Sequence, residues 1–592
     1  MPANSFKEDE QIQETARLST LLRLFSYLLS YKKQITGVLF IMAFCMIVSL
    51  MNPLFIEAAI DDYISVGDFS GLFNMIFFAL MLNIAMVLFT KLRMHIMNKM
   101  CNNILVTIRQ DLYTHIQTLD FHFFDSRPTG KILSRIIGDV NSLKEVLGNC
   151  VTTLIPELVT VISVVVIMLI KSPVLTLAAM SAIPLLAVGI WLIQTRSHAR
   201  WQIVRKKSSN LNAFLHEDLS GMRVIQSFTA ETETDTTFMQ LTEEHRVAFN
   251  NACRINDAIG SVIDLCWGIS TVALYYTGLV ILGIDKVSVG TLLAFGSYIS
   301  MFWQPIMRLS DFYKQLITNL AAAERVFEVL DTPSEITDEK ATAALPPVKG
   351  EVVFDDVSFA YSDAPDVTVL ENVSFRVKPG ETIALVGPTG AGKTTIVNLV
   401  SRFYNATKGK VLIDGHDVQE VTLHSLRSQL GIMTQDNFLF TGTVMENIRY
   451  GRLDATDKEV VEAAKAVNAH DFIMKLEKGY DTQLSERGGG LSIGQIQLLA
   501  FARTFVSMPG ILILDEATSS IDTMTERLVQ DGIQTLLAGR TSFVIAHRLS
   551  TIQRADRIFV IDNKGILEEG TAAELLEKKG AYYNLYMAQF II

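Results

Sequence analysis

The first 330 residues alternate between long apolar runs and long polar connections. A helix needs about 20 apolar residues to cross the hydrocarbon core of a bilayer, and core helices of soluble proteins rarely sustain such runs. Six runs come close to this length or exceed it. The pattern therefore predicts six membrane-spanning helices, within residues 35–60, 72–90, 146–170, 173–194, 258–282 and 290–306.

A shorter amphipathic segment, 16–33, precedes the first run. Leucine and phenylalanine recur there at helical spacing, and Lys32 and Lys33 end the segment. This pattern is typical of a helix that lies in the membrane interface, although an amphipathic helix packed on protein fits it as well.

Positive charge is distributed unevenly between the connections. Eight Lys and Arg residues lie between the second and third runs and eight more between the fourth and fifth, whereas the opposite connections hold only Lys171 and Lys286. Cytoplasmic connections of membrane proteins carry the excess of Lys and Arg. We therefore expect both termini and the two long connections to be cytoplasmic.

The second part of the chain has a different pattern. Residues 331–350 are polar and contain three prolines, which is typical of a linker. From residue 351 onward, short β-type runs alternate with helical patterns, which predicts an α/β domain. The expected domains are thus an all-α membrane domain (1–330), a linker (331–350) and an α/β domain (351–592).

Composition narrows the function classes. The 592 residues include 51 Lys and Arg and 62 Asp and Glu, for a net charge of −11, and residues 1–330 hold 26 and 27 of these. The acidic excess therefore lies in the second part, which does not favour a nucleic-acid partner. The five cysteines show no metal-binding spacing, so we expect reduced thiols.

Residues 387–395 read Gly-Pro-Thr-Gly-Ala-Gly-Lys-Thr-Thr and follow a strand-like run. They match the pattern GxxxxGK[ST], in which backbone N–H groups of a glycine-rich loop surround phosphate oxygens. Lys393 would supply a positive charge to the β and γ phosphates, and Thr394 a hydroxyl to Mg²⁺. The predicted loop comprises Gly387, Pro388, Thr389, Gly390, Ala391, Gly392, Lys393, Thr394 and Thr395.

A second apolar strand, 511–514, ends in two acids, Asp515 and Glu516. Asp515 would hold Mg²⁺, directly or through water, and Glu516 would orient or deprotonate the attacking water. Together with the phosphate loop, this pair predicts ATP hydrolysis.

With these motifs, the second part of the chain resembles the ATP-binding cassette (ABC) family. As a whole, the chain resembles an ABC exporter half-transporter of the bacterial multidrug type. Leu-Ser-Ile-Gly-Gln at 491–495 is similar to the family's LSGGQ signature. The resemblance implies that Tyr361 stacks on adenine, Gln435 reaches Mg²⁺, and His547 contacts the γ-phosphate. It also implies that the signature residues and a loop residue contribute to nucleotide binding across a dimer interface: Ser492, Gly494, Gln495 and Asp522.

The resemblance also extends to the membrane domain. Residues of about 120–143, including Phe123 and Asp125, and of about 212–230 resemble the two coupling loops that transmit motion between the ATPase and the membrane helices.

One signature position departs from the family pattern, because Ile493 stands where glycine is usual. Glycine permits close approach of backbone to phosphate, and isoleucine adds a branched side chain. In ABC dimers the signature of one subunit completes the ATP site of the other. The sequence therefore favours one half of a heterodimer with one consensus and one degenerate ATP site, and a homodimer that tolerates the substitution is the alternative.

The implied function is ATP-driven export of amphipathic small molecules by alternating access, with ATP and Mg²⁺ as cofactors, from a bacterial plasma membrane. A second half-transporter, membrane lipid and the substrate would be the partners. Lipid or peptide translocation and an ATP-dependent membrane sensor are the alternatives, and the six runs exclude a soluble mechanical ATPase. Asp264 and Glu157 lie within predicted spans, where either could meet a cationic substrate.

Overall fold

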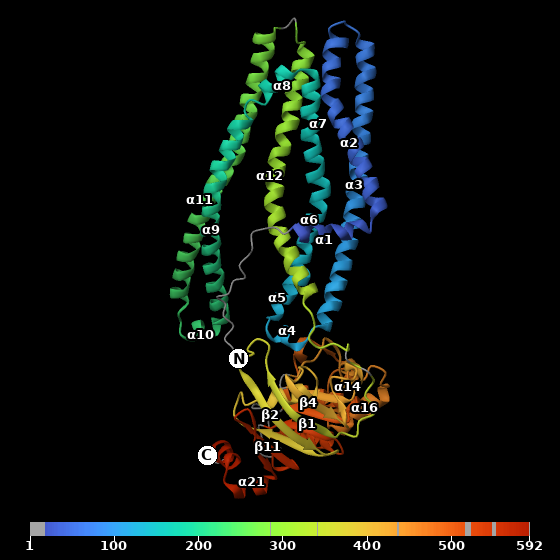
Figure 1. Cartoon of the computed structure of the whole chain (residues 1–592), viewed down its shortest axis with the longest axis vertical. Coiled ribbons are helices and arrows are strands. Elements are labelled where there is room, and N and C mark those ends of the chain that lie inside the picture. The colour runs from blue at the N-terminus through green and yellow to red at the C-terminus, as the bar shows by residue number, and fades with distance from the viewer. Residues whose placement is uncertain are drawn as a thin grey trace. The chain divides into compact units, whose positions relative to one another are not determined.

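A computed structural model describes residues 18–283, 286–339, 341, 343–434, 437–515, 523–546 and 552–590. The chain divides into two compact units. Unit 1 comprises Met1–Gln117 and Gly130–Asp331 and is helical, and unit 2 comprises Thr118–Thr129 and Thr332–Ile592 and contains all of the described strands (Figure 1).

Unit 1 consists of long helices that extend well beyond the apolar runs. The longest, α3, has 50 residues, or about 75 Å at 1.5 Å per residue. The described helical segments of unit 1 are α1 (Leu18–Leu29), α2 (Lys32–Ala58), η1 (Ala59–Ile64), α3 (Phe69–Thr118), α5 (Thr129–Ser134), η2 (Arg135–Asp139), α6 (Val140–Asn149), η3 (Cys150–Leu154), α7 (Ile155–Lys171), α8 (Pro173–Ala179), α9 (Ile183–Ser220), α10 (Met222–Ser227), α11 (Glu231–Tyr276), η4 (Thr277–Leu282) and α12 (Val289–Asp331).

Five helical stretches among the described residues are long and apolar enough to cross a membrane. They contain the first five predicted spans. The sixth span falls in α12, which is not among the five because glycine, serine, glutamine and proline interrupt its apolar stretch. That span stays a prediction.

The amphipathic segment forms α1, which packs on α12. Leu24 and Leu28 are buried, and Arg23 pairs with Asp331 at 2.6 Å. Leu22 and Leu29 are more than half exposed on the other side of the helix. One side of α1 is therefore packed on protein, and the other remains apolar and available to a membrane interface.

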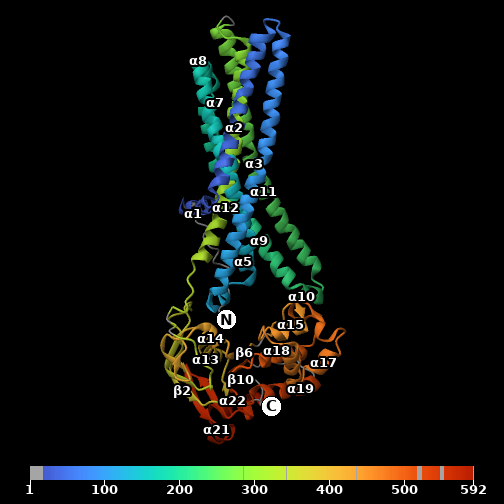
Figure 2. The same cartoon turned by 90° about the vertical axis from the view of Figure 1, so that its right-hand side faces the viewer.

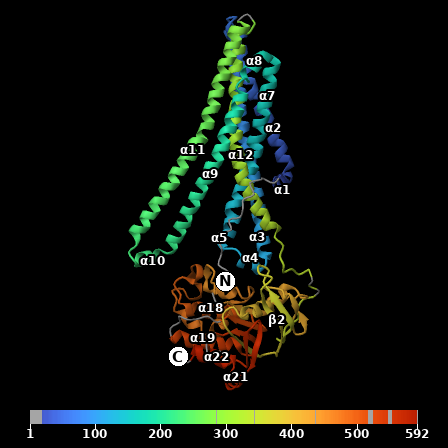
Figure 3. The same ribbon diagram turned by 60° about the vertical axis from the view of Figure 1, so that its left-hand side comes forward.

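The long helices α9 and α11 run side by side in all three views, with α10 at their common end (Figures 1, 2 and 3). An ion pair between Lys207 and Glu244 at 2.5 Å links the two helices. Closer to the predicted outer ends of the helices, buried side chains of several helices form one apolar core that includes Phe295, Tyr298 and Cys266.

Unit 2 is built on a six-stranded sheet in the order β12-β11-β3-β10-β9-β6, in which only β12 runs antiparallel. A four-stranded antiparallel sheet has the order β2-β1-β4-β5. Their strands are β1 (Val352–Ala360), β2 (Thr368–Val377), β3 (Thr382–Val386), β4 (Lys408–Ile413), β5 (His416–Asp417), β6 (Leu430–Met433), β9 (Ile511–Asp515), β10 (Thr541–Ile545), β11 (Arg557–Asp562) and β12 (Gly565–Gly570).

The central strands of the six-stranded sheet are apolar on both faces, as parallel strands covered on both sides usually are. In β9, Ile511 and Ile513 join the core that contains the antiparallel sheet and α13 (Lys393–Val400). Leu512 and Leu514 join the core that contains α18 (Ile493–Val506) and α19 (Thr523–Leu537). Because side chains alternate between the two faces of each strand, the six-stranded sheet packs against both of these cores.

Two segments outside 351–592 belong to unit 2. One is Thr118–Thr129, which contains α4 (Phe121–Asp125) and lies within the stretch expected to be the membrane domain. The other is the expected linker, whose backbone is held by the folded domain: Asp414 accepts hydrogen bonds from the amides of Lys349 and Glu351 at 2.5 and 2.8 Å. The linker is thus anchored over its last residues.

Candidate functional site

The predicted phosphate loop and acids meet at one edge of the six-stranded sheet. In the parallel register Leu385 of β3 pairs with Ile545 of β10, and Ile545 pairs with Asp515 of β9. On the far side of β9, Leu514 pairs with Met433 of β6. Segments far apart in sequence therefore leave the sheet at the same level, which is where open α/β sheets bind their ligands.

The loop between β3 and α13 has a backbone that favours glycine. Gly387, Gly390 and Gly392 have φ angles of 152°, 84° and 102°. A Cβ atom on Gly387 would lie 2.2 Å from the carbonyl oxygen of Ile561. The loop can thus turn tightly around a phosphate at the N-terminus of α13 only with glycine at these positions.

Lys393 folds back over this loop. Its ammonium donates to the carbonyl oxygens of Gly387 and Pro388, both at 2.8 Å. Burial lowers the pKa of Lys393, and the charge of nearby Asp515 opposes that change. The cation is therefore held beside the turn that would surround a phosphate.

The donor set at this edge fits Mg²⁺. Thr394 is exposed at the start of α13 and Asp515 is half-buried at the end of β9. Among the described residues there is no cluster of three or more His, Cys, Asp and Glu side chains for a metal. One hydroxyl and one carboxylate suffice, because Mg²⁺ in such sites takes its remaining ligands from phosphates and water.

Tyr361 lies beside the phosphate loop. Its hydroxyl is 3.1 Å from the hydroxyl of Thr395, which is buried in α13. Its ring packs edge-on with those of Phe359 and Tyr404, with centroids 4.8 and 5.2 Å apart. Tyr361 is thus fixed next to the loop, and its stacking on adenine stays a prediction.

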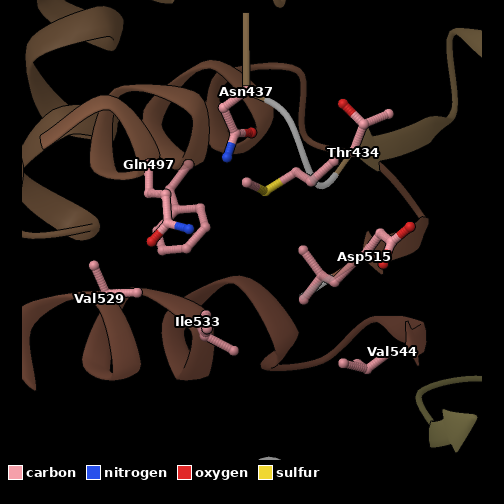
Figure 4. A pocket seen from close by; sticks show the side chains of 10 residues that line it. Thr434, Asn437, Gln497, Asp515, Val529, Ile533 and Val544 are labelled. Atoms are coloured by element: carbon pink, nitrogen blue, oxygen red, sulfur yellow. The ribbon is translucent and has the colours of Figure 1, made fainter. Parts of the chain in front are cut away.

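A small cavity of about 30 Å³ lies between α18, α19 and the end of β9 (Figure 4). Thr434, Asn437, Gln497 and Asp515 line its polar part. Gln497 is 8% exposed, and among the described residues its side-chain oxygen has no hydrogen-bond partner. Sequence reasoning missed this residue, whose only signal was a glutamine between apolar residues in the middle of the helix.

The signature residues begin α18. Ser492 is the N-cap: its hydroxyl accepts from the amide of Gln495 at 3.3 Å, and the Gln495 side chain accepts from the amide of Ser492 at 2.9 Å. Ile493 occupies the first helical position, is 54% exposed and lacks a positive φ angle. Within its own chain the isoleucine is therefore neither strained nor crowded, and it changes only the outward surface.

Four predicted site residues lie outside the described residues: Gln435, Glu516, Asp522 and His547. Along the chain, three of them follow strands β6, β9 and β10 within two residues.

Segment Thr118–Thr129 overlaps the first predicted coupling loop and makes specific contacts within unit 2. The ring of Phe121 lies 4.2 Å from that of Phe403, and the Tyr404 hydroxyl donates to Asp125 at 2.7 Å. Burial, reinforced by Asp125, raises the pKa of Tyr404, which keeps the hydroxyl a donor. Sequence reasoning missed Phe403 and Tyr404, because nothing in their local pattern distinguishes them.

The second predicted coupling loop is different. Its helix α10 and the adjoining turns belong to unit 1 and expose large apolar side chains. Leu219, Val224 and Phe228 are 68%, 60% and 80% exposed. These residues would pack against another surface more favourably than they contact water.

The two acids predicted within spans have different surroundings. Glu157 is largely buried and pairs with Arg308 at 2.6 Å. Asp264 on α11 is exposed, and it has no ion pair or hydrogen bond among the residues that the structure describes. Glu157 is therefore engaged in joining α7 to α12, whereas Asp264 is available.

Comparison with known proteins agrees with this architecture. Residues 35–306 match the model of the ABC transporter transmembrane region, and residues 370–519 match that of the ABC transporter. The uncharacterized ABC transporter ATP-binding protein YknV of Bacillus subtilis (strain 168) is 40% identical over 99% of this chain and 97% of its own length.

Other relatives carry functional names. An ATP-dependent lipid A-core flippase of Syntrophus aciditrophicus (strain SB) is 38% identical over 82% of this chain and 80% of its own length. A putative multidrug export ATP-binding/permease protein of Staphylococcus aureus (strain NCTC 8325 / PS 47) is 35% identical over 96% of this chain and 99% of its own length.

The structure of a bacterial Atm1-family ABC exporter with ATP bound is similar as well, with a TM-score of 0.79, 29% identity, and coverage of 95% of this chain and 99% of that one. Helical membrane domain and α/β ATPase domain are thus both matched over nearly the whole chain. The protein is a member of the ABC exporter family, a multi-pass membrane protein whose ATP-binding domain hydrolyses ATP to drive transport.

Proposed function

We propose that this chain exports amphipathic small molecules, including drugs, across the bacterial plasma membrane by alternating access, with both termini and the ATPase domain in the cytoplasm. The observation that carries the proposal is the coupling segment Thr118–Thr129, which continues directly from the long helix α3 and packs on the nucleotide domain through Phe121 and Asp125. A conformational change at the nucleotide site can therefore reach a membrane helix through the continuous backbone of this segment and α3.

The residues of the ATP site have distinct roles in this proposal. Lys393 and the loop amides bind the phosphates, Tyr361 stacks on adenine, and Asp515, Thr394 and Gln435 hold Mg²⁺. The bound Mg²⁺ would neutralise charge on the phosphates. Glu516 orients or deprotonates the attacking water, and His547 donates a hydrogen bond to the γ-phosphate.

The substrate chamber is inferred from polar positions on α11 and α12. Gln304, Arg308 and Gln315 are exposed along one side of α12, and Ser261 and Asp264 along one side of α11. Polar side chains at membrane depth rarely face lipid and usually line a water-filled cavity or a protein contact. Asp264 lies 18 residues, or about 27 Å, from the outer end of η4, within the inner half of a bilayer core about 30 Å thick.

These charges favour a cationic amphipathic substrate. Arg308 already has Glu157 as its counterion, whereas Asp264 has none among the described residues. A cation that enters from the inner leaflet would meet Asp264 near the depth of its own headgroup.

Assembly as a dimer is supported by the exposed apolar end of the α9–α11 pair. Half-transporters of this family dimerise, and α10 with Phe228 offers a surface for a partner subunit's nucleotide domain. We infer a heterodimer, because the exposed Ile493 would face the partner's ATP site and weaken it, while this chain keeps Lys393, Asp515 and Glu516.

Lipid translocation is the second candidate, favoured by the flippase among the relatives. A peptide exporter and an ATP-dependent sensor share the same domains, so transport must be measured directly.

Export is tested in proteoliposomes that contain the assembled transporter and a fluorescent cationic dye. We expect ATP-dependent accumulation of the dye, and Glu516→Gln should abolish it while lowering ATP hydrolysis about 100-fold or more, because general-base catalysis is lost. Glu477→Gln, an exposed glutamate in the same domain, is the control and should behave as the wild type. ATP hydrolysis without movement of dye or fluorescent lipid would favour the sensor.

The heterodimer is tested by purifying the chain alone and together with the product of a neighbouring ABC gene. We expect the pair to hydrolyse ATP at least about tenfold faster than the single chain, since a loss of only about 1.4 kcal/mol of transition-state stabilisation at a defective site has this effect. Ile493→Gly should raise the activity of the single chain. Robust hydrolysis and transport by the unmodified single chain would refute the heterodimer.

The role of Asp264 is tested by stimulation of ATP hydrolysis with dodecyltrimethylammonium and with dodecanol, which share a chain and differ in charge. Asp264→Asn should raise the half-maximal concentration of the cation about tenfold, the typical effect of losing a charged hydrogen-bonding partner, and leave that of the alcohol unchanged. Asp235→Asn, at the cytoplasmic end of α11, is the control. Equal shifts for both probes would contradict the assignment.

A further inference from the structure

A continuous run of side-chain contacts joins the coupling segment to the phosphate-loop helix inside unit 2. Asp125 accepts a hydrogen bond from the Tyr404 hydroxyl at 2.7 Å. The Tyr404 ring packs edge-on with the Tyr361 ring at 5.2 Å, and the Tyr361 hydroxyl lies 3.1 Å from that of Thr395. Three side-chain contacts therefore separate α4 from α13.

Tyr404 is held on its other sides as well. Its ring meets that of Phe359 at 5.7 Å, and the adjacent Phe403 is covered by Phe121. The guanidinium of Arg427 lies over the Phe403 ring at 5.1 Å. Because aromatic pairs prefer defined edge-on or offset geometries, a shift of one ring is transmitted to the next.

The same region has room for such a shift. A cavity of about 140 Å³ is lined by Asp120, Glu335, Phe359, Tyr404 and Asn405. It lies between the coupling segment and the first strand of the domain. A ring displaced from one position beside this cavity can therefore find a second one, which a close-packed core would not allow.

We propose that Tyr404 is a positioning residue. When adenine stacks on Tyr361, Tyr404 transmits this change to the coupling segment through its hydrogen bond with Asp125. The proposal rests on the proposed function, in which Tyr361 stacks on adenine. Stacking fixes the Tyr361 ring, the edge-on contact fixes Tyr404, and the hydrogen bond holds α4. Phosphates meet this route only at the Thr395 hydroxyl, whereas adenine acts directly on the Tyr361 ring.

A purely supporting role for Tyr404 makes a different prediction. If the ring only filled space, the hydroxyl would be dispensable and every nucleotide-like ligand would affect the coupling segment alike. The distinguishing quantity is thus the part of the response that requires the adenine base.

Hydrogen exchange of residues 118–129, measured on the assembled transporter in nanodiscs, tests this. The probes are AMP-PNP, which carries adenine, and inorganic tripolyphosphate, which does not. In the wild type AMP-PNP should slow exchange of this segment about fivefold more than tripolyphosphate does, a difference of about 1 kcal/mol. Tyr404→Phe should remove the difference and leave protection of the phosphate loop by AMP-PNP intact.

Two further variants sharpen the test. Asp125→Ala, which removes the acceptor, should reduce the adenine-specific response as Tyr404→Phe does, and the double variant should lose no more than either single one. Tyr480→Phe is the matched control: its hydroxyl bonds His470 at 2.8 Å in the same domain, away from this route, and it should keep the response.

The outcomes separate the inference from the proposed function. An adenine-specific response that survives in Tyr404→Phe, or that the wild type lacks although AMP-PNP protects the phosphate loop, overturns the inference alone. Loss of AMP-PNP binding in Tyr404→Phe also overturns it, since the residue would then only build the site. If AMP-PNP fails to protect the loop of the wild type, the proposed function fails too.

Discussion

In the proposed transport cycle, everything else depends on the contact between a segment continuous with a membrane-domain helix and the nucleotide domain. Thr118–Thr129 is continuous with α3, yet it packs with the ATPase through Phe121 against Phe403 and through Asp125 and Tyr404. An ATPase domain can do work on membrane helices only if its conformational change is energetically linked to a conformational change of those helices. This contact is the proposed link within one chain.

The nucleotide site depends on strand register. Three parallel strands end level with one another, and the glycines that follow β3 let the loop turn where a Cβ atom would collide with Ile561. The membrane domain is governed by a different constraint, the cost of charge at membrane depth. Arg308 neutralises Glu157, whereas Asp264 has no ion pair or hydrogen bond among the described residues.

Much of this could be predicted from the sequence. Five apolar runs form helices long enough to span a membrane, and the phosphate loop and Asp515 follow strands of the expected α/β domain. These features are local: they depend on periodicity or on a motif. Tyr404, Gln497 and the Glu157–Arg308 pair could not be predicted, because their roles come from contacts between segments far apart in the chain. The exposure of Ile493 could not be predicted either, because it depends on where α18 begins, and Ser492 caps that helix.

The most direct test of the central claim is the number of dye molecules transported per ATP hydrolysed, measured in proteoliposomes for the wild type and for Phe121→Ala. Removing the ring eliminates the aromatic contact with Phe403 and leaves the phosphate loop untouched. We predict that this ratio falls about tenfold while basal ATP hydrolysis stays within about twofold of the wild type. An unchanged ratio, or transport and hydrolysis that fall in parallel, would contradict the account.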